Sequence, residues 1–268
     1  MTDRSLIFIG AVILLAVVGA ATLAPVIAPH DPTRQDLEND LIAPSREHPL
    51  GTDKLGRDVL SRILYGARVS AAVGISTVAV SLLIGLLVGS IAGYFGGWID
   101  HLLMRLVDIL MAFPGILLAI AFTAVLGPGL DHVVLALGLI GWTGYARLVR
   151  GEILALREKE FIHAARALGG SPARVILGHM LPNLIPPLLI QGTFAMAAAI
   201  IAEGGLSFLG LGAQPPTPSW GSMLNEGRQF ILVAPHLTAF PGLAIMATVL
   251  GLNLLGDGLR DRLEKRGK

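Results

Sequence analysis

The chain has 268 residues, of which 53% are hydrophobic and 15% are charged, and its formal net charge at pH 7 is +1. Soluble domains are about 25% charged, so a chain this poor in charge must expose much of its surface to lipid. The small net charge argues against a nucleic-acid-binding surface. The lack of cysteine excludes disulfides, thiolate metal sites and cysteine nucleophiles, and the spacing of the seven histidines does not favour a metal site.

Uncharged stretches predict the membrane spans, because a transmembrane helix needs about 20 residues without charge. The second stretch is long, so its end near 94–98 is expected at the membrane surface. The fourth is short and is expected to extend to about Gly151. The pattern predicts an all-α polytopic membrane protein with about six transmembrane helices. The stretches are 5–29, 69–99, 109–130, 132–146, 175–202 and 229–256.

The first stretch is either a cleaved signal peptide or a retained anchor. Its apolar run follows Arg4 and is longer than the usual signal-peptide core of about 7–15 residues. Further spans also follow it. We therefore predict a retained N-terminal transmembrane helix over 1–29.

The segment 30–68 is rich in charge of both signs. Its Gly51 and Gly56 have the spacing of a phosphate-binding loop. Arg57 and Asp58 follow them where that loop needs lysine and a hydroxyl residue, so nucleotide binding is excluded.

Asp58 and Arg62 have the i,i+4 spacing of a helical ion pair, which predicts an amphipathic surface helix over 58–65. The whole segment is either a docking or gating face outside the membrane or a solvated connector before the second span. Long ordered loops often carry function.

Small residues recur every fourth position in the second span and predict a stripe along which another helix can approach closely. Asp108 and Arg105 are three residues apart and predict an ion pair at the start of the third span. Pro182 and the prolines at 186–187 are expected to mark the start of the fifth span. The small residues are Thr77, Ser81, Gly85, Gly89, Gly93 and Gly97.

The segment 151–182 is too charged to cross a membrane and too regular to be a linker. Residues 161–168 predict a short helix that Gly169 ends. Ser171 then predicts an N-cap with Pro172 at the first helical position. The expected structure is a helix, a sharp turn and a second helix at the membrane face.

Glu203 ends an uncharged run, and an ionisable residue at membrane depth is functional by default. The adjacent Gly204 and Gly205 allow a second interpretation, in which Glu203 lies at the outer interface and pairs with an arginine such as Arg228. The proline-rich segment 206–218 is expected to cap the outer mouth of the bundle.

The distribution of basic residues predicts the orientation. If the N-terminus is cytoplasmic, most of the 20 Lys and Arg residues lie in cytoplasmic segments, including the basic tail 263–268. An even number of spans then places both termini in the cytoplasm.

Four motifs resemble those of one family, the ABC importer permeases of the dipeptide/oligopeptide/nickel type, most closely the C-type subunit. Ala164, Ala165 and Gly169, followed by Leu181-Pro182, resemble the EAA coupling loop of that family, although His163 replaces its glutamate and His179 a usual isoleucine. The other three motifs lie at 48–70, 203–221 and 253–261.

The resemblance implies a type I ABC importer (MetI-like) fold with a five-helix permease core over 69–262. It implies coupling to ATPase subunits through 151–182 and docking or gating at the outer face. The implied coupling residues are Phe161, Ala164, Ala165, Leu168, Gly169, Ser171 and Pro172. The implied outer-face residues are Gly51, Asp53, Gly56, Arg57, Asp58, Glu203 and Trp220.

The resemblance also implies the partners: a second homologous permease, two ATP-binding subunits, an extracytoplasmic solute-binding protein and membrane lipid. The chain would bind no cofactor, because ATP would be bound and hydrolysed on the partner subunits, and it would not be an enzyme. It would lie in the cytoplasmic membrane of a bacterium or archaeon.

The expected cargo is a di- or oligopeptide, with nickel or a metal chelate as the alternative within the same family. An ion-coupled secondary transporter is the alternative from another class, but the sequence shows neither the inverted repeats nor the ionisable relays that it requires. An intramembrane enzyme would need paired carboxylates or a Ser/His arrangement at depth, and only Glu203 is a candidate.

Overall fold

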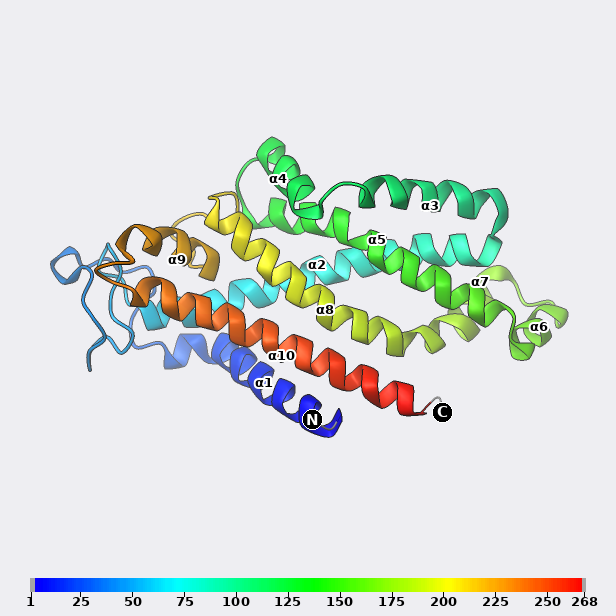
Figure 1. The fold of residues 1–268 in the computed structure, drawn as a ribbon, viewed down its shortest axis with the longest axis horizontal. Helices are drawn as coiled ribbons and strands as arrows, with labels where there is room; N and C mark the ends of the chain where they lie inside the picture. The colour runs from blue at the N-terminus through cyan, green and yellow to red at the C-terminus, as the bar shows by residue number, and fades with distance from the viewer. Residues whose placement is uncertain (1–2, 267–268) are drawn as a thin grey trace.

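The computed structural model describes residues 3–266, and the long elements within them are helices that run along the long axis of the molecule (Figure 1). Short helical turns occur at Leu37–Asn39, Ile176–Met180 and Arg228–Phe230. The helices are α1 (Asp3–Ile27), α2 (Val59–Phe95), α3 (Gly97–Met111), α4 (Gly115–Leu126), α5 (Leu130–Arg157), α6 (Glu160–Ala167), α7 (Pro172–Val175), α8 (Leu181–Phe208), α9 (Trp220–Gly227) and α10 (His236–Arg266).

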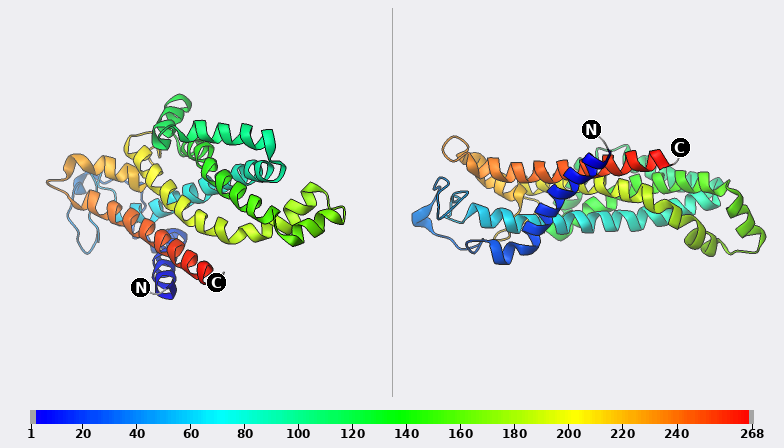
Figure 2. Two further views of the ribbon diagram at one scale, coloured as in Figure 1. Left: turned by 45° about the vertical axis from the view of Figure 1, so that its right-hand side comes forward. Right: turned by 90° about the horizontal axis from the view of Figure 1, so that it is seen from below.

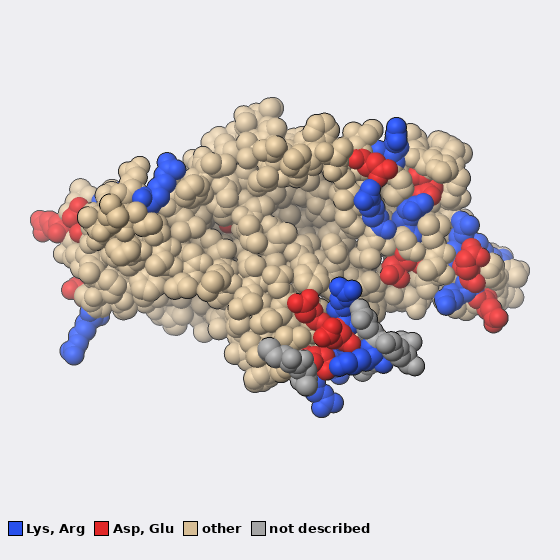
Figure 3. All heavy atoms as spheres, viewed as in Figure 1, with Lys and Arg blue, Asp and Glu red and all other residues tan. Residues whose placement is uncertain are grey.

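The connecting segments gather at opposite ends of this bundle (Figure 1). Residues 28–58 and α9 form one end, called here the α9 end, and α6 with α7 forms the other, the α6 end. On the face drawn in Figure 3, charged side chains lie near these ends and near the chain termini, with an uncharged band between them. This band is the surface expected to contact lipid.

The long helices confirm the predicted all-α membrane architecture. In the described part of the chain, five helical segments are long and apolar enough to span a membrane, or six if the bent pair α3 and α4 counts as one span. Figure 2 shows α1 crossing α10 obliquely at the edge of the bundle. The tail predicted over 263–268 is the last turn of α10 up to Arg266, and 267–268 lie outside the described residues.

The third predicted span, over 109–130, is wrong as a continuous helix. α3 and α4 meet at an angle of 84° around residues 112–114. Pro114 has no amide donor and disfavours a helical conformation at Phe113, so the chain breaks there and restarts as α4.

Two further helix boundaries differ from the predictions. α2 begins at Val59, so the amphipathic helix expected over 58–65 is the first part of the second span. With 37 residues, α2 is about 55 Å long, well beyond the ~30 Å of hydrocarbon. Of the prolines expected at the start of the fifth span, Pro182 lies in the first turn of α8, whereas Pro186 and Pro187 lie inside that helix. A π-helical turn at Ile176–Met180 precedes α8.

α2 and α5 pack along the predicted stripe of small residues. A Cβ added to Gly89 would lie 2.6 Å from the Ala146 carbonyl oxygen and 2.7 Å from Cβ of Val149. Gly85 and Gly93 face α5 in the same way, whereas Gly97 lies beyond the end of α2. The stripe therefore brings the two helix backbones into direct contact, as predicted.

Candidate functional site

The α6 end has the helix–turn–helix that the sequence predicted. α6 is followed by Gly169, whose φ of +80° suits glycine and ends the helix. Ser171 then accepts a hydrogen bond from the Arg174 amide, with Pro172 as the first residue of α7. These local signals were sufficient to place the turn.

The outer surface of α6 is apolar at its tip. Leu168 is 89% exposed and Phe161 is 46% exposed. They border a shallow groove of about 410 Å³ that also brings together the predicted Ala164 and Ala165. These four side chains form an apolar patch on an otherwise charged loop, and contiguous apolar patches are a feature of interaction surfaces.

The inner side of α6 is fixed to the bundle. Ile162 is fully buried in a cluster with Val149, Ile153 and Val175. The guanidinium of Arg166 lies 4.7 Å from the ring centroid of Tyr94 near the end of α2. A displacement of α6 is therefore expected to reach α2 and α5 directly.

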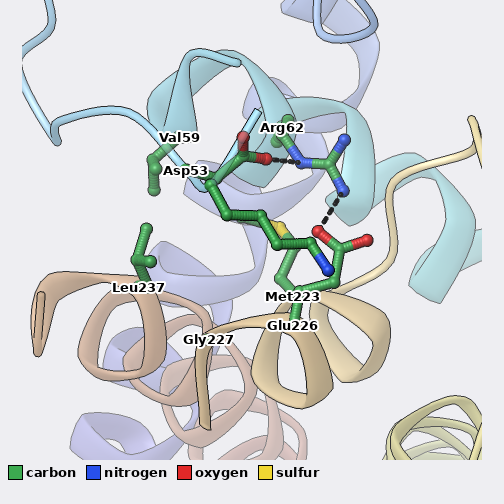
Figure 4. Close-up of a pocket in the computed structure, with 8 residues that line it drawn as sticks. Asp53, Val59, Arg62, Met223, Glu226, Gly227 and Leu237 are labelled. Carbon is green, nitrogen blue, oxygen red and sulfur yellow. Dashed lines mark ion pairs between the residues drawn. The ribbon is translucent and has the colours of Figure 1, made fainter. Parts of the chain in front are cut away.

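At the α9 end, two predicted residues join a charged quartet formed by Asp53, Arg57, Arg62 and Glu226. Arg57 donates from Nε to Asp53 Oδ2 at 2.7 Å and from Nη2 to Glu226. Arg62 lies 3.5 Å from both carboxylates (Figure 4). The quartet is neutral as a set, and both arginine side chains are almost fully buried.

The quartet fastens residues 53–57 to α9 and does not form a ligand pocket. The adjoining cavity, shown in Figure 4, has a volume of about 10 Å³, which is room for no more than one water molecule. Gly56 lies so close to Asp36 that a Cβ would overlap the Asp36 carbonyl oxygen. Gly51, also with positive φ, packs against His236.

The predicted pair between Asp58 and Arg62 is wrong. Asp58 is the N-cap of α2, and its Oδ2 accepts hydrogen bonds from the amide and hydroxyl of Ser61. Its other oxygen faces His48 and His30. Capping turns the carboxylate back toward the helix start, which leaves Arg62 free to reach Glu226.

Glu203 and Trp220 are buried where α8, α9 and α2 meet. Glu203 is 1% exposed and accepts a hydrogen bond from Ser207 Oγ at 2.6 Å. The partner predicted for it is wrong, because Arg228 lies over the Phe208 ring instead. Trp220 is buried and donates from Nε1 to the Ile63 carbonyl at 3.0 Å.

Another predicted ion pair is also replaced. Asp108 accepts a hydrogen bond from Arg147 of α5 rather than pairing with Arg105 on its own helix. Asp100 likewise binds Arg150. These pairs join α3 to α5.

A groove of about 290 Å³ lies in the middle of the bundle between α2, α4, α5 and α8. Its lining is mainly apolar, with Thr77, Ser81 and Tyr145 as polar members, and Ala198 is exposed in it. The sequence placed Thr77 and Ser81 only on the packing stripe, because periodicity identifies a helix face but not the cavity beside it.

Comparison with known proteins identifies two family matches. Residues 85–268 match the binding-protein-dependent transport system inner membrane component family. Residues 4–44 match the N-terminal transmembrane domain of oligopeptide transport permease C.

The most informative relatives are bacterial permeases. The chain is 46% identical over 268 residues to a dipeptide transport system permease protein of Alkalihalophilus pseudofirmus, with 100% of this chain and 88% of the relative covered. It is 50% identical over 258 residues to a glutathione transport system permease protein of Escherichia coli, with 96% and 84% covered.

Among solved structures, the inward-facing MetNI methionine ABC transporter has a similar fold. The TM-score is 0.60 at 18% sequence identity, over 77% of this chain and 96% of the matched chain.

Proposed function

Because this chain belongs to the family of binding-protein-dependent transport system inner membrane components, it is a multi-pass permease subunit of an ABC importer, and we propose that its cargo is a short peptide. The predicted family and fold are thereby confirmed. The relatives above are named for a dipeptide and for glutathione, so peptide-like solutes are the chemistry that they share. The nickel alternative has no comparable support among these relatives.

The importer would contain the predicted partners: a second homologous permease, two ATP-binding subunits and an external solute-binding protein. The central groove supports the pairing of two permeases. It is bordered by α2, α4, α5 and α8 and leaves Ala198 exposed, so a second subunit is needed to enclose a pathway. ATP would be hydrolysed on the separate ATP-binding subunits.

We place the α6 end and both termini in the cytoplasm and the α9 end outside a bacterial or archaeal cytoplasmic membrane. The distribution of basic residues supports this orientation. The α9 end, with the 30–58 segment and α9, would then meet the solute-binding protein.

Coupling through α6 rests chiefly on one observation, the exposed apolar tip at Leu168 of a helix whose opposite side is buried in the bundle. Such a tip can enter a groove on an ATP-binding subunit. ATP-driven closure of those subunits would move α6 and, through it, α2 and α5, so that the pathway opens alternately to the two sides.

Leu168→Asp is expected to remove most of the ATP-binding subunit that co-purifies with the permease, because the new carboxylate would have to be buried in an apolar contact. The measurement is the amount of ATP-binding subunit retained when the tagged permease is purified. Leu232→Asp is the matched control, since Leu232 is 95% exposed but lies between α9 and α10 at the opposite end. Equal retention by both variants would contradict coupling through α6.

Ala198→Phe is expected to lower peptide uptake severalfold, because the larger side chain fills the central groove without displacing buried atoms. The measurement is uptake of a labelled dipeptide or tripeptide by vesicles containing the complete importer and its binding protein. Ala16→Phe on the exposed surface of α1 is the control. Unchanged peptide uptake by Ala198→Phe would contradict the proposed pathway. If the wild-type importer takes up a metal chelate but no peptide, the proposed cargo is wrong.

A further inference from the structure

Three metal-ligating side chains that are spread along the 28–58 segment meet at the α9 end: His30, His48 and Asp58. One ligand atom of each lies within 4.8 Å of the others. Asp58 Oδ1 is 2.9 Å from His48 Nδ1 and 3.7 Å from His30 Nδ1. The sequence did not favour a metal site, because the three residues have no recognisable ligand spacing along the chain.

We propose that His30, His48 and Asp58 bind a divalent transition-metal ion of the zinc type. Two imidazoles and a carboxylate form a nitrogen and oxygen ligand set that Zn²⁺ favours. Bond lengths of about 2.0–2.1 Å in a tetrahedral site require ligand atoms about 3.3 Å apart. The two distances from Asp58 Oδ1 lie on either side of that value, and all three ligand atoms lie within 4.8 Å of one another. Closing the site therefore requires side-chain movements of about 1–1.5 Å.

The unmet hydrogen-bonding capacity of His30 is independent support. Its Nδ1 is buried and has no hydrogen-bond partner within residues 3–266, and its distance to Asp58 exceeds that of a hydrogen bond. A buried polar atom without a partner requires an explanation. A metal ion between His30 and Asp58 would be coordinated by this nitrogen and would supply its missing partner.

Asp58 is held in position for this role. Its side chain is fully buried, and its Oδ2 accepts hydrogen bonds from the amide and hydroxyl of Ser61. The same hydroxyl accepts a hydrogen bond from the His30 amide. These contacts orient Oδ1 toward the two imidazoles, as partners outside the coordination sphere do in metal sites.

The surroundings favour a cation and leave room for a further ligand. The cluster borders a cavity of about 140 Å³ whose lining also includes Asp31, Asp36 and Glu47, with Arg34 as its one other charged residue among those described. The cavity can hold a water molecule as the fourth ligand. The ion would fasten the beginning and the middle of the 28–58 segment to the N-terminus of α2, where Asp58 is the N-cap.

The test is metal binding by the full-length purified permease in detergent, measured by titration with Zn²⁺ against a chromophoric chelator and with Co²⁺ by its visible absorption. We expect one tightly bound ion per chain. His30→Gln and His48→Gln should each weaken that binding by about tenfold or more. His101→Gln, at an exposed histidine on α3, should leave it unchanged.

Wild-type protein provides a second test that does not depend on how the variants fold. X-ray absorption of the bound ion should show two imidazole nitrogens in its first coordination shell. Any one of three results would overturn the proposal. These are unchanged metal binding in a His30→Gln/His48→Gln double variant, no tight metal binding by the wild type, and a coordination shell without imidazole. None of these measurements uses transport, so their outcome is separate from that of the peptide uptake experiment.

Discussion

Arg57→Met is expected to lower the free energy of unfolding by about 3–5 kcal/mol, the usual cost of removing one partner from a buried ion pair. Arg57 is 4% exposed and bonds both Asp53 and Glu226. Without it, Arg62 alone, 3.5 Å from each, would face two carboxylates with little access to water. The measurement is a denaturant titration of the purified permease, followed by tryptophan fluorescence.

The matched control is Arg68→Met, which removes an exposed arginine from α2, the helix that follows Arg57, and is expected to change stability little. A triple variant that also carries Asp53→Asn and Glu226→Gln should regain part of the stability, because it leaves no uncompensated carboxylate. If Arg57→Met and Arg68→Met destabilise the protein equally, the quartet does not stabilise the attachment of residues 53–57 to α9.

Gly89→Ala is expected to destabilise the contact between α2 and α5 by about 1–3 kcal/mol, as overpacking does in other interiors. The added methyl group would meet the Ala146 carbonyl oxygen at 2.6 Å, and a backbone atom cannot rotate away. The two helices must therefore separate. The same denaturant titration measures the loss.

Gly151→Ala provides the comparison on α5, since a Cβ there meets no described atom within 4 Å. This substitution should leave stability unchanged or raise it by up to about 1 kcal/mol through helix propensity. A stability loss in Gly151→Ala as large as that in Gly89→Ala would show that the glycines matter for a reason other than close packing.

The features that the sequence predicted well depend on local chemistry. The absence of charge over long stretches indicates spans, and Gly169 and Ser171 indicate the end of one helix and the start of the next. The stripe through Gly85, Gly89 and Gly93 follows from helical periodicity, which is also local.

The features that the sequence did not predict depend on distant residues. Arg57 binds Glu226, which is 169 positions away, and no spacing rule connects them. Arg147 takes the partner that was assigned to Arg105 because α5 packs against α3. Asp58 shows that a local rule can also fail, because helix capping competes with an i,i+4 ion pair for the same carboxylate.

One uninterrupted helix connects the two ends of this permease. Tyr94, near the last turn of α2, lies beneath Arg166 of α6, and Ile63, in its second turn, accepts the hydrogen bond from Trp220 of α9. At Gly85, Gly89 and Gly93, α2 has no side chain between its backbone and α5 that could absorb a shift. We therefore expect α2 to move as a rigid body. A tilt imposed on its end at α6 would then displace its end at α9 directly, on the other side of the membrane.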